Sequence, residues 1–225
     1  CTQYNRSLST ALVMLGILLI VLGVAHDENA VTNYRNLLKR PGNPVDDFLL
    51  LDGIGAVAIN TGVNIILATI VVLAIGGDIN GPTIGGILTI AGFSVKGKHA
   101  RNILPVMLGI ILSGLMRGGG AVVTPAAQLA LLFGTTLAPI SGTYGFPAGI
   151  VAGFIHSCVV LYAGAGYSGV NLYNNGFAGG LVAIVMHSVL SEFFRPKEYS
   201  KPSDSMLPKP LHDEDVNIDD LYFHE

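Results

Sequence analysis

Long apolar runs alternate with short polar connections along most of the chain. The runs cover residues 10–26, 48–76, 79–95, 103–116, 121–138, 147–165 and 177–194. Several approach the roughly 20 apolar residues that a helix needs to cross the hydrocarbon core of a bilayer. Charged residues lie almost entirely between these runs and from Glu192 onward. The pattern predicts an all-α integral membrane protein with about seven membrane segments.

Two of these segments carry the same asparagine- and glycine-rich pattern. The first is I-N-G-P-T-I-G-G-I-L-T-I-A-G-F-S-V, and the second begins N-G-F-A-G-G-L-V-A-I-V. The matching positions are Asn80-Gly81 with Asn175-Gly176, and Gly85-Gly86 with Gly179-Gly180 after one deletion. Short, glycine-interrupted segments in corresponding places are typical of a transporter's binding site. We expect an internal repeat, with elements at 79–95 and 175–194 that contain short, broken or re-entrant helices.

The polar connections indicate the orientation. Residues 27–47 form a loop with a short helix over 30–38, residues 96–101 form a basic turn, and residues 139–147 form a loop or broken helix. Lys and Arg are concentrated in the first two and after residue 194, and such residues favour the cytoplasm. Seven crossings place all three there, with the N-terminus outside and both repeat elements parallel. A re-entrant 121–138 segment would instead invert the repeats and place the tail outside.

Three regions follow from this pattern. Residues 1–9 form an N-terminal segment, residues 10–194 the transmembrane domain, and residues 195–225 a cytoplasmic tail. The tail is acidic and rich in proline, and we expect a partner or the protein's own cytoplasmic face to order it. Because the chain opens on Cys1 and a span follows almost at once, we expect it to be part of a longer protein of the cell membrane.

The amino-acid composition indicates which kinds of partner the protein is expected to have. Only 12% of the 225 residues are charged and 51% are hydrophobic, so lipid is the expected solvent for most of the chain. The net charge of -3 argues against a nucleic-acid partner. The 29 glycines favour close helix packing, and we expect a homo-oligomer or a larger membrane assembly.

The candidate solute site lies where the two repeat elements open. A helix broken inside the membrane offers free amide and carbonyl groups to a polar solute. The expected contacts come from Asn80, Gly81, Thr83, Asn175 and Gly176. The alternative is that Asn-Gly only forms a turn at the membrane surface.

Neutral polar side chains within apolar runs are candidates for lining the pathway. Asn60 and Asn64 share a helix face, and Gln128 lies in a later segment. Such side chains can equally hydrogen bond across helices as structural contacts. Asp52 is a candidate for ion coupling, or else it lies at the membrane interface.

The sequence indicates no enzyme, cofactor or metal. His156 and His187 lie in apolar segments, but no further ligands stand at metal-binding spacing. Hydrolase, zinc-protease and nucleotide-binding motifs do not occur in the sequence.

Four stretches resemble a known family. They are N-G-P-T-I-G-G-I-L-T-I-A-G-F, K-H-A-R-N-I-L-P-V-M-L-G, F-G-T-T-L-A-P-I-S-G-T-Y-G-F-P-A-G-I-V-A-G-F-I-H and L-Y-N-N-G-F-A-G-G-L-V-A. Together they are similar to a bacterial multi-span family known only as a domain of unknown function, which implies a membrane protein and no particular activity. The Asn-Gly openings are also similar to those of urea transporters.

We therefore expect a membrane permease or channel-like transporter for a small polar solute, with its site at the junction of the repeat elements. The main alternative is a structural or accessory subunit of a larger complex, which would use the glycine-rich faces and the acidic tail to bind partners. An intramembrane enzyme that uses His156 or His187 is the weakest alternative.

Overall fold

The computed structural model describes residues 2–43, 46–166 and 171–195. Every named element in this part of the chain is a helix, which confirms the predicted all-α class. In chain order the elements are α1 (Thr2–His26), α2 (Ala30–Leu37), α3 (Phe48–Ala74), α4 (Gly81–Gly92), α5 (Ala100–Met116), the 3₁₀ helix η1 (Gly119–Ala121), α6 (Pro125–Phe133), the 3₁₀ helix η2 (Gly134–Leu137), α7 (Ala138–Tyr144), α8 (Phe146–Gly166) and α9 (Asn171–Phe193).

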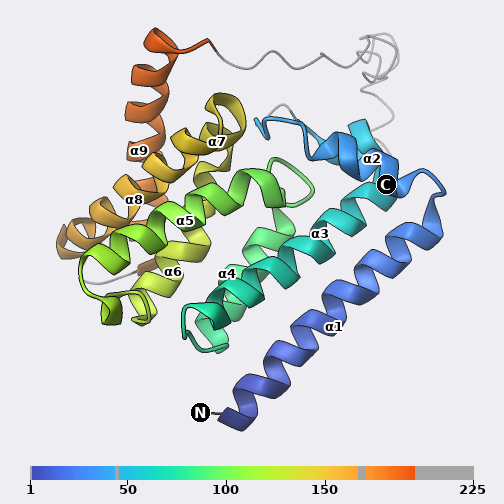
Figure 1. Cartoon of the computed structure of the whole chain (residues 1–225), viewed down its shortest axis with the longest axis horizontal. Coiled ribbons are helices and arrows are strands. Elements are labelled where there is room, and N and C mark those ends of the chain that lie inside the picture. The colour runs from blue at the N-terminus through green and yellow to red at the C-terminus, as the bar shows by residue number, and fades with distance from the viewer. Residues whose placement is uncertain (1, 44–45, 167–170, 196–225) are drawn as a thin grey trace, which may run out of the picture.

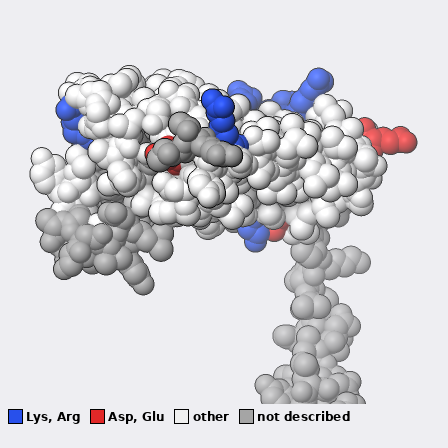
Figure 2. All heavy atoms as spheres, turned by 90° about the horizontal axis from the view of Figure 1, so that it is seen from below, with Lys and Arg blue, Asp and Glu red and all other residues white. Residues whose placement is uncertain are grey.

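Four of the described helices are long and apolar enough to cross a bilayer. They cover Tyr4–His26, Phe48–Ala74, Phe146–Ala163 and Asn174–Phe193, and Gly81–Gly92 and Ala100–Met116 are shorter apolar helices. Large apolar side chains stay exposed on the outer helices, for example Leu18 on α1 (53%) and Ile184 on α9 (69%). Figure 2 shows only isolated charged side chains over one face of the molecule. A surface of this kind is compatible with a membrane-embedded protein.

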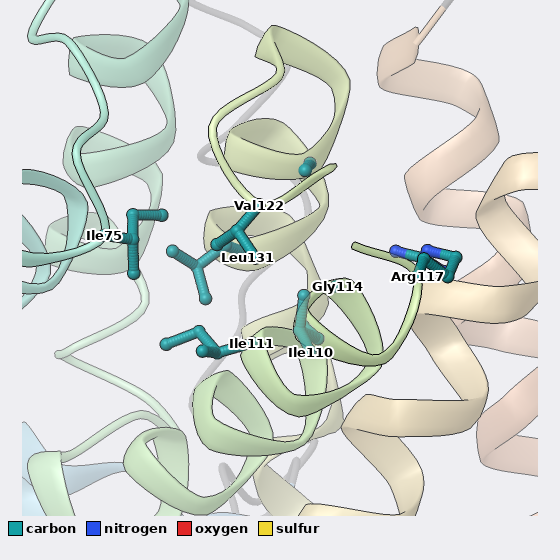
Figure 3. A pocket seen from close by; sticks show the side chains of 8 residues that line it. Ile75, Ile110, Ile111, Gly114, Arg117, Val122 and Leu131 are labelled. Carbon is teal, nitrogen blue, oxygen red and sulfur yellow. The ribbon is translucent and has the colours of Figure 1, made fainter. Parts of the chain in front are cut away.

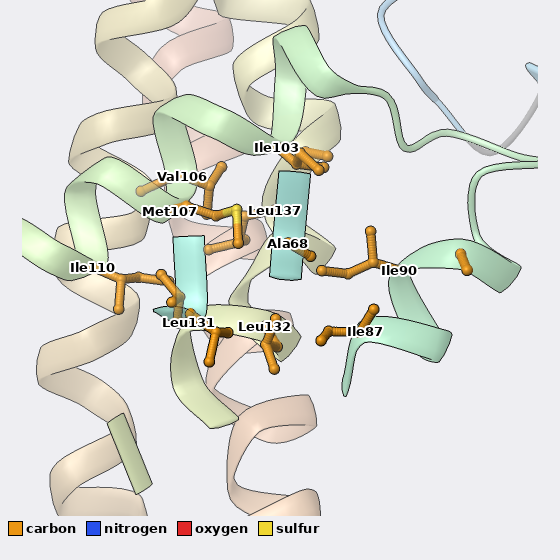
Figure 4. Packing of buried hydrophobic residues seen from close by; sticks show 14 of the residues in the cluster. Ala68, Ile87, Ile90, Ile103, Val106, Met107, Ile110, Leu131, Leu132 and Leu137 are labelled. Atoms are coloured by element: carbon orange, nitrogen blue, oxygen red, sulfur yellow. The ribbon is translucent and has the colours of Figure 1, made fainter. Parts of the chain in front are cut away.

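The helices pack in two neighbouring groups. Helix α1 lies antiparallel to α3 on one side of the molecule, and α5 lies against α8 on the other (Figure 1). Between them, apolar side chains of α3, α4, α5 and α6 meet in one core (Figure 4). Ile87 and Ile90 of α4 face this core together with Met107 of α5 and Leu132 of α6, all fully buried.

Long-range contacts define two ends of this bundle. At the first, which we name the α2 end, Leu37 packs with Phe48 and Val95, and Thr143 donates a hydrogen bond to Asn43. At the second, the Arg117 end, Asn5 hydrogen bonds to Asp78 and to the amide of Ile79. Helix α5 joins the two ends, because its 17 residues extend for about 25 Å.

Two glycines bend the chain. The hydrophobic pattern does not predict the bend at Gly53 and predicts the bend at Gly145 only as a broken helix over 139–147. Gly53, with φ 83° and ψ 163°, kinks α3 after its first turn, whereas the sequence shows one apolar run over 48–76. Gly145, with φ 100°, separates α7 from α8, which confirms the broken helix predicted over 139–147. Both backbone conformations lie in the region that L-residues with a Cβ avoid.

The predicted equivalence of the two Asn-Gly pairs is wrong. Asn80 precedes α4 and caps it, but Asn175 lies inside α9, which runs without a break from Asn171 to Phe193. The difference follows from Pro82, which stands in the first turn of α4, where its missing amide hydrogen costs nothing. Because no proline follows Gly176, nothing stops the helix from continuing through that pair.

Candidate functional site

Two buried asparagines fix the turn between α4 and α5, residues 93–99. The amide of Asn60 donates to the carbonyl oxygens of Ser94 and Lys98, each at 2.8 Å. The amide of Asn64 donates to Ser94 Oγ at 2.7 Å and to the Lys98 carbonyl at 3.2 Å. These bonds satisfy buried backbone groups that no helix could satisfy. They hold the backbone of this turn against the middle of α3.

The turn carries a buried lysine into the bundle. Lys98 is only 6% exposed, and its Nζ donates to Thr135 Oγ1 of η2 at 3.0 Å. The ammonium group also lies 4.9 Å from the centre of the Phe93 ring, a cation–π distance. Among the described residues, the Thr135 hydroxyl and the face of the Phe93 ring therefore contact the charged Lys98 ammonium group.

In the described residues, no carboxylate lies within ion-pair distance of Lys98. The two acidic side chains nearest along the chain at this end are paired elsewhere, because Asp52 binds Arg40 and Asp47 binds Lys96. Burial lowers the pKa of Lys98 from 10.5 to about 8. Most of the amine is still charged at pH 7, so the protein holds a buried cation without a counter-ion among these residues.

Two cavities meet at this lysine. The first, the α2-end cavity, has a volume of about 330 Å³ and extends toward Asn43 and Lys96. The second, the α4–α9 cavity, has a volume of about 260 Å³ and lies between Thr89 of α4 and Gly176 of α9. They share Phe93, Lys98 and Thr136, and none of the described residues that line either one is Asp or Glu.

A third cavity lies at the Arg117 end. It has a volume of about 370 Å³, and its lining includes Arg117, Ser157 of α8 and Asn174 of α9. The Arg117 guanidinium donates to Ser113 Oγ at 3.1 Å and to Ser157 Oγ at 3.0 Å. Among the described residues no carboxylate pairs with Arg117, so a second cation without a counter-ion faces a cavity.

The cavities of the two ends reach the same short stretch of α9. Asn174 lines the Arg117 cavity and Gly176 lines the α4–α9 cavity, although Lys98 and Arg117 stand before and after the whole length of α5. The residue between them, Asn175, is buried beside His156 of α8. His156 is fully buried and packs close to Gly134 of η2. The two cavities therefore reach α9 within one helical turn, next to the buried contact between Asn175 and His156.

A further gap near Arg117 cannot hold a solute. It lies between α3, α5 and α6, has a volume of only about 10 Å³ and is lined mostly by aliphatic side chains. A volume of this size is at most the space of one water molecule. Figure 3 shows that Arg117 lies on the α8 side of this gap, away from Ile75 and Leu131. Arg117 thus lines the edge of this gap as well as the larger cavity.

The predicted contacts at the opening of α4 form a helix cap. Asn80 Oδ1 accepts the amide of Thr83 at 3.2 Å, and Thr83 Oγ1 accepts the amide of Asn80 at 2.8 Å. This reciprocal pair satisfies the first turn of the helix. Neither residue, nor Gly81, lines any of the cavities described above. The alternative of a turn that starts a helix therefore fits these three residues.

The second Asn-Gly pair lies closer to the cavities than the first. Gly176 lines the α4–α9 cavity, and Asn175, the residue before it, is buried beside His156. Thr89 and Phe93 of the first predicted element line the same cavity. The structure thus brings the two elements together at Gly176, through the far half of α4 and not through Asn80.

The other predicted polar residues make local contacts. Asn60 and Asn64 hold the 93–99 turn, and the amide of Gln128 donates to the Val123 carbonyl at 2.8 Å. The Asp52 carboxylate receives two hydrogen bonds from the Arg40 guanidinium, one from Nη2 at 3.0 Å and one from Nε at 2.6 Å. Asn60 and Asn64 thus make the kind of structural contact given as their alternative, Gln128 bonds to the turn before its own helix, and Asp52 forms a buried ion pair.

Sequence reasoning missed Lys98. Its neighbours Lys96 and Arg101 are exposed, and a basic turn between two apolar segments is normally a solvated membrane-surface feature. The long-range donors Asn60 and Asn64 decide that this turn folds inward. The hydrogen bonds from these asparagines to the turn could have revealed the buried lysine, but they join distant parts of the sequence and are visible only in the structure.

In the described residues no group of three or more His, Cys, Asp or Glu side chains is arranged to hold a metal ion. His187 stands apart from His156, and its Nδ1 lies 3.1 Å from the Tyr144 hydroxyl near the α2 end.

Comparison with known proteins identifies a family. No curated protein and no solved structure matches the chain. One family model, described as a protein of unknown function (DUF1576), matches residues 26–192, which include every helix from α2 to α8 and almost all of α9. The chain therefore belongs to the DUF1576 family of proteins of unknown function.

Proposed function

We propose that this protein is a membrane permease or channel-like transporter for a small polar solute. The observation that carries the proposal is the approach of two cavities from opposite ends of the bundle to Asn174 and Gly176 of α9. Binding sites of transporters commonly lie near the bilayer midplane between packed segments. In this protein we assign that place to the part of α9 around Asn175, which is buried beside His156 of α8.

The proposal includes the number of crossings and the orientation. Contacts place the ends of successive segments alternately at the Arg117 end and the α2 end, which supports seven crossings: α1, α3, α4, α5, the joined α6–η2–α7 segment, α8 and α9. Most Lys and Arg of the described residues stand in the loops of the α2 end, whereas Arg6 and Arg117 stand at the other. The positive-inside rule then favours a cytoplasmic α2 end.

Polar groups line the proposed route without a continuous open channel. The α4–α9 cavity and the Arg117 cavity are separate, with volumes of about 260 and 370 Å³. Passage of a solute therefore requires a rearrangement at α9 or at the facing η2 segment. Gly134 and Gly179 adjoin His156 from these two elements, so small residues surround the point where the rearrangement is needed.

The test is transport by purified protein in proteoliposomes. Light scattering would follow swelling with a panel of small solutes, namely urea, glycerol, formate and acetate. Gly176→Leu is the informative variant, because a Cβ at Gly176 meets nothing within 4 Å and the larger side chain fills the α4–α9 cavity without a clash. We expect at least one solute to enter faster than in empty liposomes, and Gly176→Leu to lose most of that rate.

Gly85→Leu is the matched control. Gly85 also has open space around a Cβ, and a leucine there leans toward the start of α4, away from Thr89. This variant should transport as the wild type does. Equal rates for Gly176→Leu and the wild type would reject the assigned route, and the absence of uptake for every solute of the panel would count against the permease proposal itself.

A further inference from the structure

The charge balance around the cavities points to the class of solute. The α2-end cavity and the α4–α9 cavity both contain Lys98, and the other ionisable side chain that the described residues contribute to their linings is Lys96. Lys96 is already paired, with its Nζ 3.3 Å from Asp47 Oδ2. The free positive charge at these cavities therefore resides on Lys98.

A buried ammonium group needs more than its described neighbours supply. It has three N–H donors, and one of them is directed at Thr135 Oγ1. The same end of the protein shows how a buried charge is normally treated, because Asp52, at 5% exposure, receives two hydrogen bonds from Arg40. Buried charges in proteins are paired unless they neutralise. Lys98 is the exception, and its unpaired side lies at the junction of two cavities.

The space beside Lys98 suits a small ion with some of its water. The α2-end cavity has a volume of about 330 Å³, whereas one water molecule occupies about 30 Å³ of liquid. The Thr135 hydroxyl itself donates to the Leu132 carbonyl, at 2.6 Å, so its position is fixed. Asn60 and Asn64 fix the Lys98 backbone in the same way. The cation is therefore held in place before any ligand arrives.

We propose that Lys98 binds an oxyanion group, either a carboxylate or a phosphate, and that the transported solute carries this group. The inference rests on the proposed transport function for the identity of the solute, but oxyanion binding at Lys98 does not require transport. A phospholipid headgroup presents the same chemistry as a free anion, so the test separates these two sources.

Binding is measured by thermal unfolding of the purified full chain in a neutral detergent. Sodium acetate, sodium phosphate or sodium sulfate replaces sodium chloride at constant ionic strength. At about 100 times the dissociation constant, at least one oxyanion should raise the unfolding midpoint by about 5 °C or more, and the rise should saturate. Lys98→Met should abolish the rise, and Lys98→Gln, which keeps a donor for Thr135, should fold normally and also lose it.

Lys39→Met is the matched control. Lys39 is exposed at the same end, so this variant removes the same charge and should keep the full rise in midpoint. If no oxyanion exceeds chloride in the wild type, or if Lys98→Gln keeps the rise, the oxyanion site is refuted.

Native mass spectrometry distinguishes the source of the anion. Phosphatidylglycerol that stays bound to the wild type and is lost from Lys98→Gln would confirm the oxyanion site but assign it to a lipid, which overturns its assignment to the solute. The liposome assay is scored separately. Uptake of a neutral solute that is unaffected by Lys98→Gln would leave the permease proposal standing and reject an anionic solute. Oxyanion binding without uptake of any solute would leave the oxyanion site standing and reject the permease proposal.

Discussion

At the scale of single residues, buried polar groups decide the structure of the α2 end. His99 is 2% exposed, and its Nε2 donates to the Arg40 carbonyl at 2.9 Å, because a carbonyl can only accept. Its amide donates to Asn102 Oδ1 at 2.9 Å, which caps α5. Burial is the main cause that lowers the pKa of His99 from 6.5 to about 4, and the nearby Arg101 adds to the effect.

This shift predicts a loss of stability in acid. The unfolded chain takes up a proton at His99 near pH 6.5, whereas the folded protein does so only near pH 4. The free energy of unfolding should therefore fall as the pH drops through this window, by up to about 3 kcal/mol from this group. His99→Gln, which keeps a donor for Arg40, should flatten the pH dependence of the unfolding midpoint in detergent. His26→Gln, at an exposed histidine, should not. Identical profiles for wild type and His99→Gln would contradict the prediction.

The same scale gives a second prediction, for the donor that holds the 93–99 turn. Asn60→Leu removes the donor of the buried Ser94 carbonyl and one of the two amide donors of the Lys98 carbonyl, which keeps Asn64 at 3.2 Å. Buried groups that lose their partners cost about 1–3 kcal/mol. Chemical unfolding should show a loss of this size, whereas Asn36→Leu on the exposed side of α2 should change stability by less than about 0.5 kcal/mol. A near-wild-type Asn60→Leu would show that the turn does not depend on this amide.

At the scale of elements, small residues set how closely helices approach, but only some of the glycine motifs do so. A Cβ on Gly109 of α5 would overlap the carbonyl oxygen of Ile150, and one on Gly153 of α8 would overlap that of Val106. By contrast, Gly81, Gly85 and Gly180 have nothing within 4 Å of a Cβ. The sequence has the Gly-x-x-x-Gly spacing at 81–85, 149–153 and 176–180, and of these it is a packing motif at Gly149–Gly153 and not in α4 or α9.

A pair of alanine substitutions tests this difference. Gly153→Ala should destabilise the protein by about 1–3 kcal/mol or more, because α5 and α8 must separate to admit the methyl group. Gly85→Ala should raise stability by about 0.5–1 kcal/mol, since alanine favours a helix and the site is open. Unfolding in the same detergent gives both values. Equal changes in the free energy of unfolding at the two glycines would show that the close contact between α5 and α8 does not determine stability.

At the scale of the whole molecule, the alternation of segment ends predicts which side each loop faces. In a background that carries Cys1→Ser and Cys158→Ser, Asn36→Cys stands at the α2 end and Gly119→Cys at the Arg117 end, and both positions are exposed. In intact cells a membrane-impermeant maleimide should label Gly119→Cys and should label Asn36→Cys only after permeabilisation. Labelling of both in intact cells, or the reverse pattern, would reject the proposed crossings.

Much of this architecture was predictable from residue order. The apolar runs indicate the helices, Asn80 and Pro82 indicate the start of α4, and the two glycines and two prolines of 139–147 indicate the break before α8. The kink at Gly53 was not predicted, because Asp52 and Gly53 stand inside a long apolar run that a straight helix would also show. The candidate site was predictable only in part, since Gly176 lines a cavity and Asn80 does not.

The sequence alone determined that this protein is helical and rich in segments apolar enough for a membrane, because hydrophobicity and backbone hydrogen bonding act along the chain. Only the tertiary structure decided that Lys98 lies inside the bundle, since this depends on donors more than 30 residues away on α3. It also decided that two cavities meet α9 at neighbouring residues. The sequence places Lys98 in what looks like a basic surface turn. The structure buries it, because the side-chain amides of Asn60 and Asn64 satisfy the backbone of that turn.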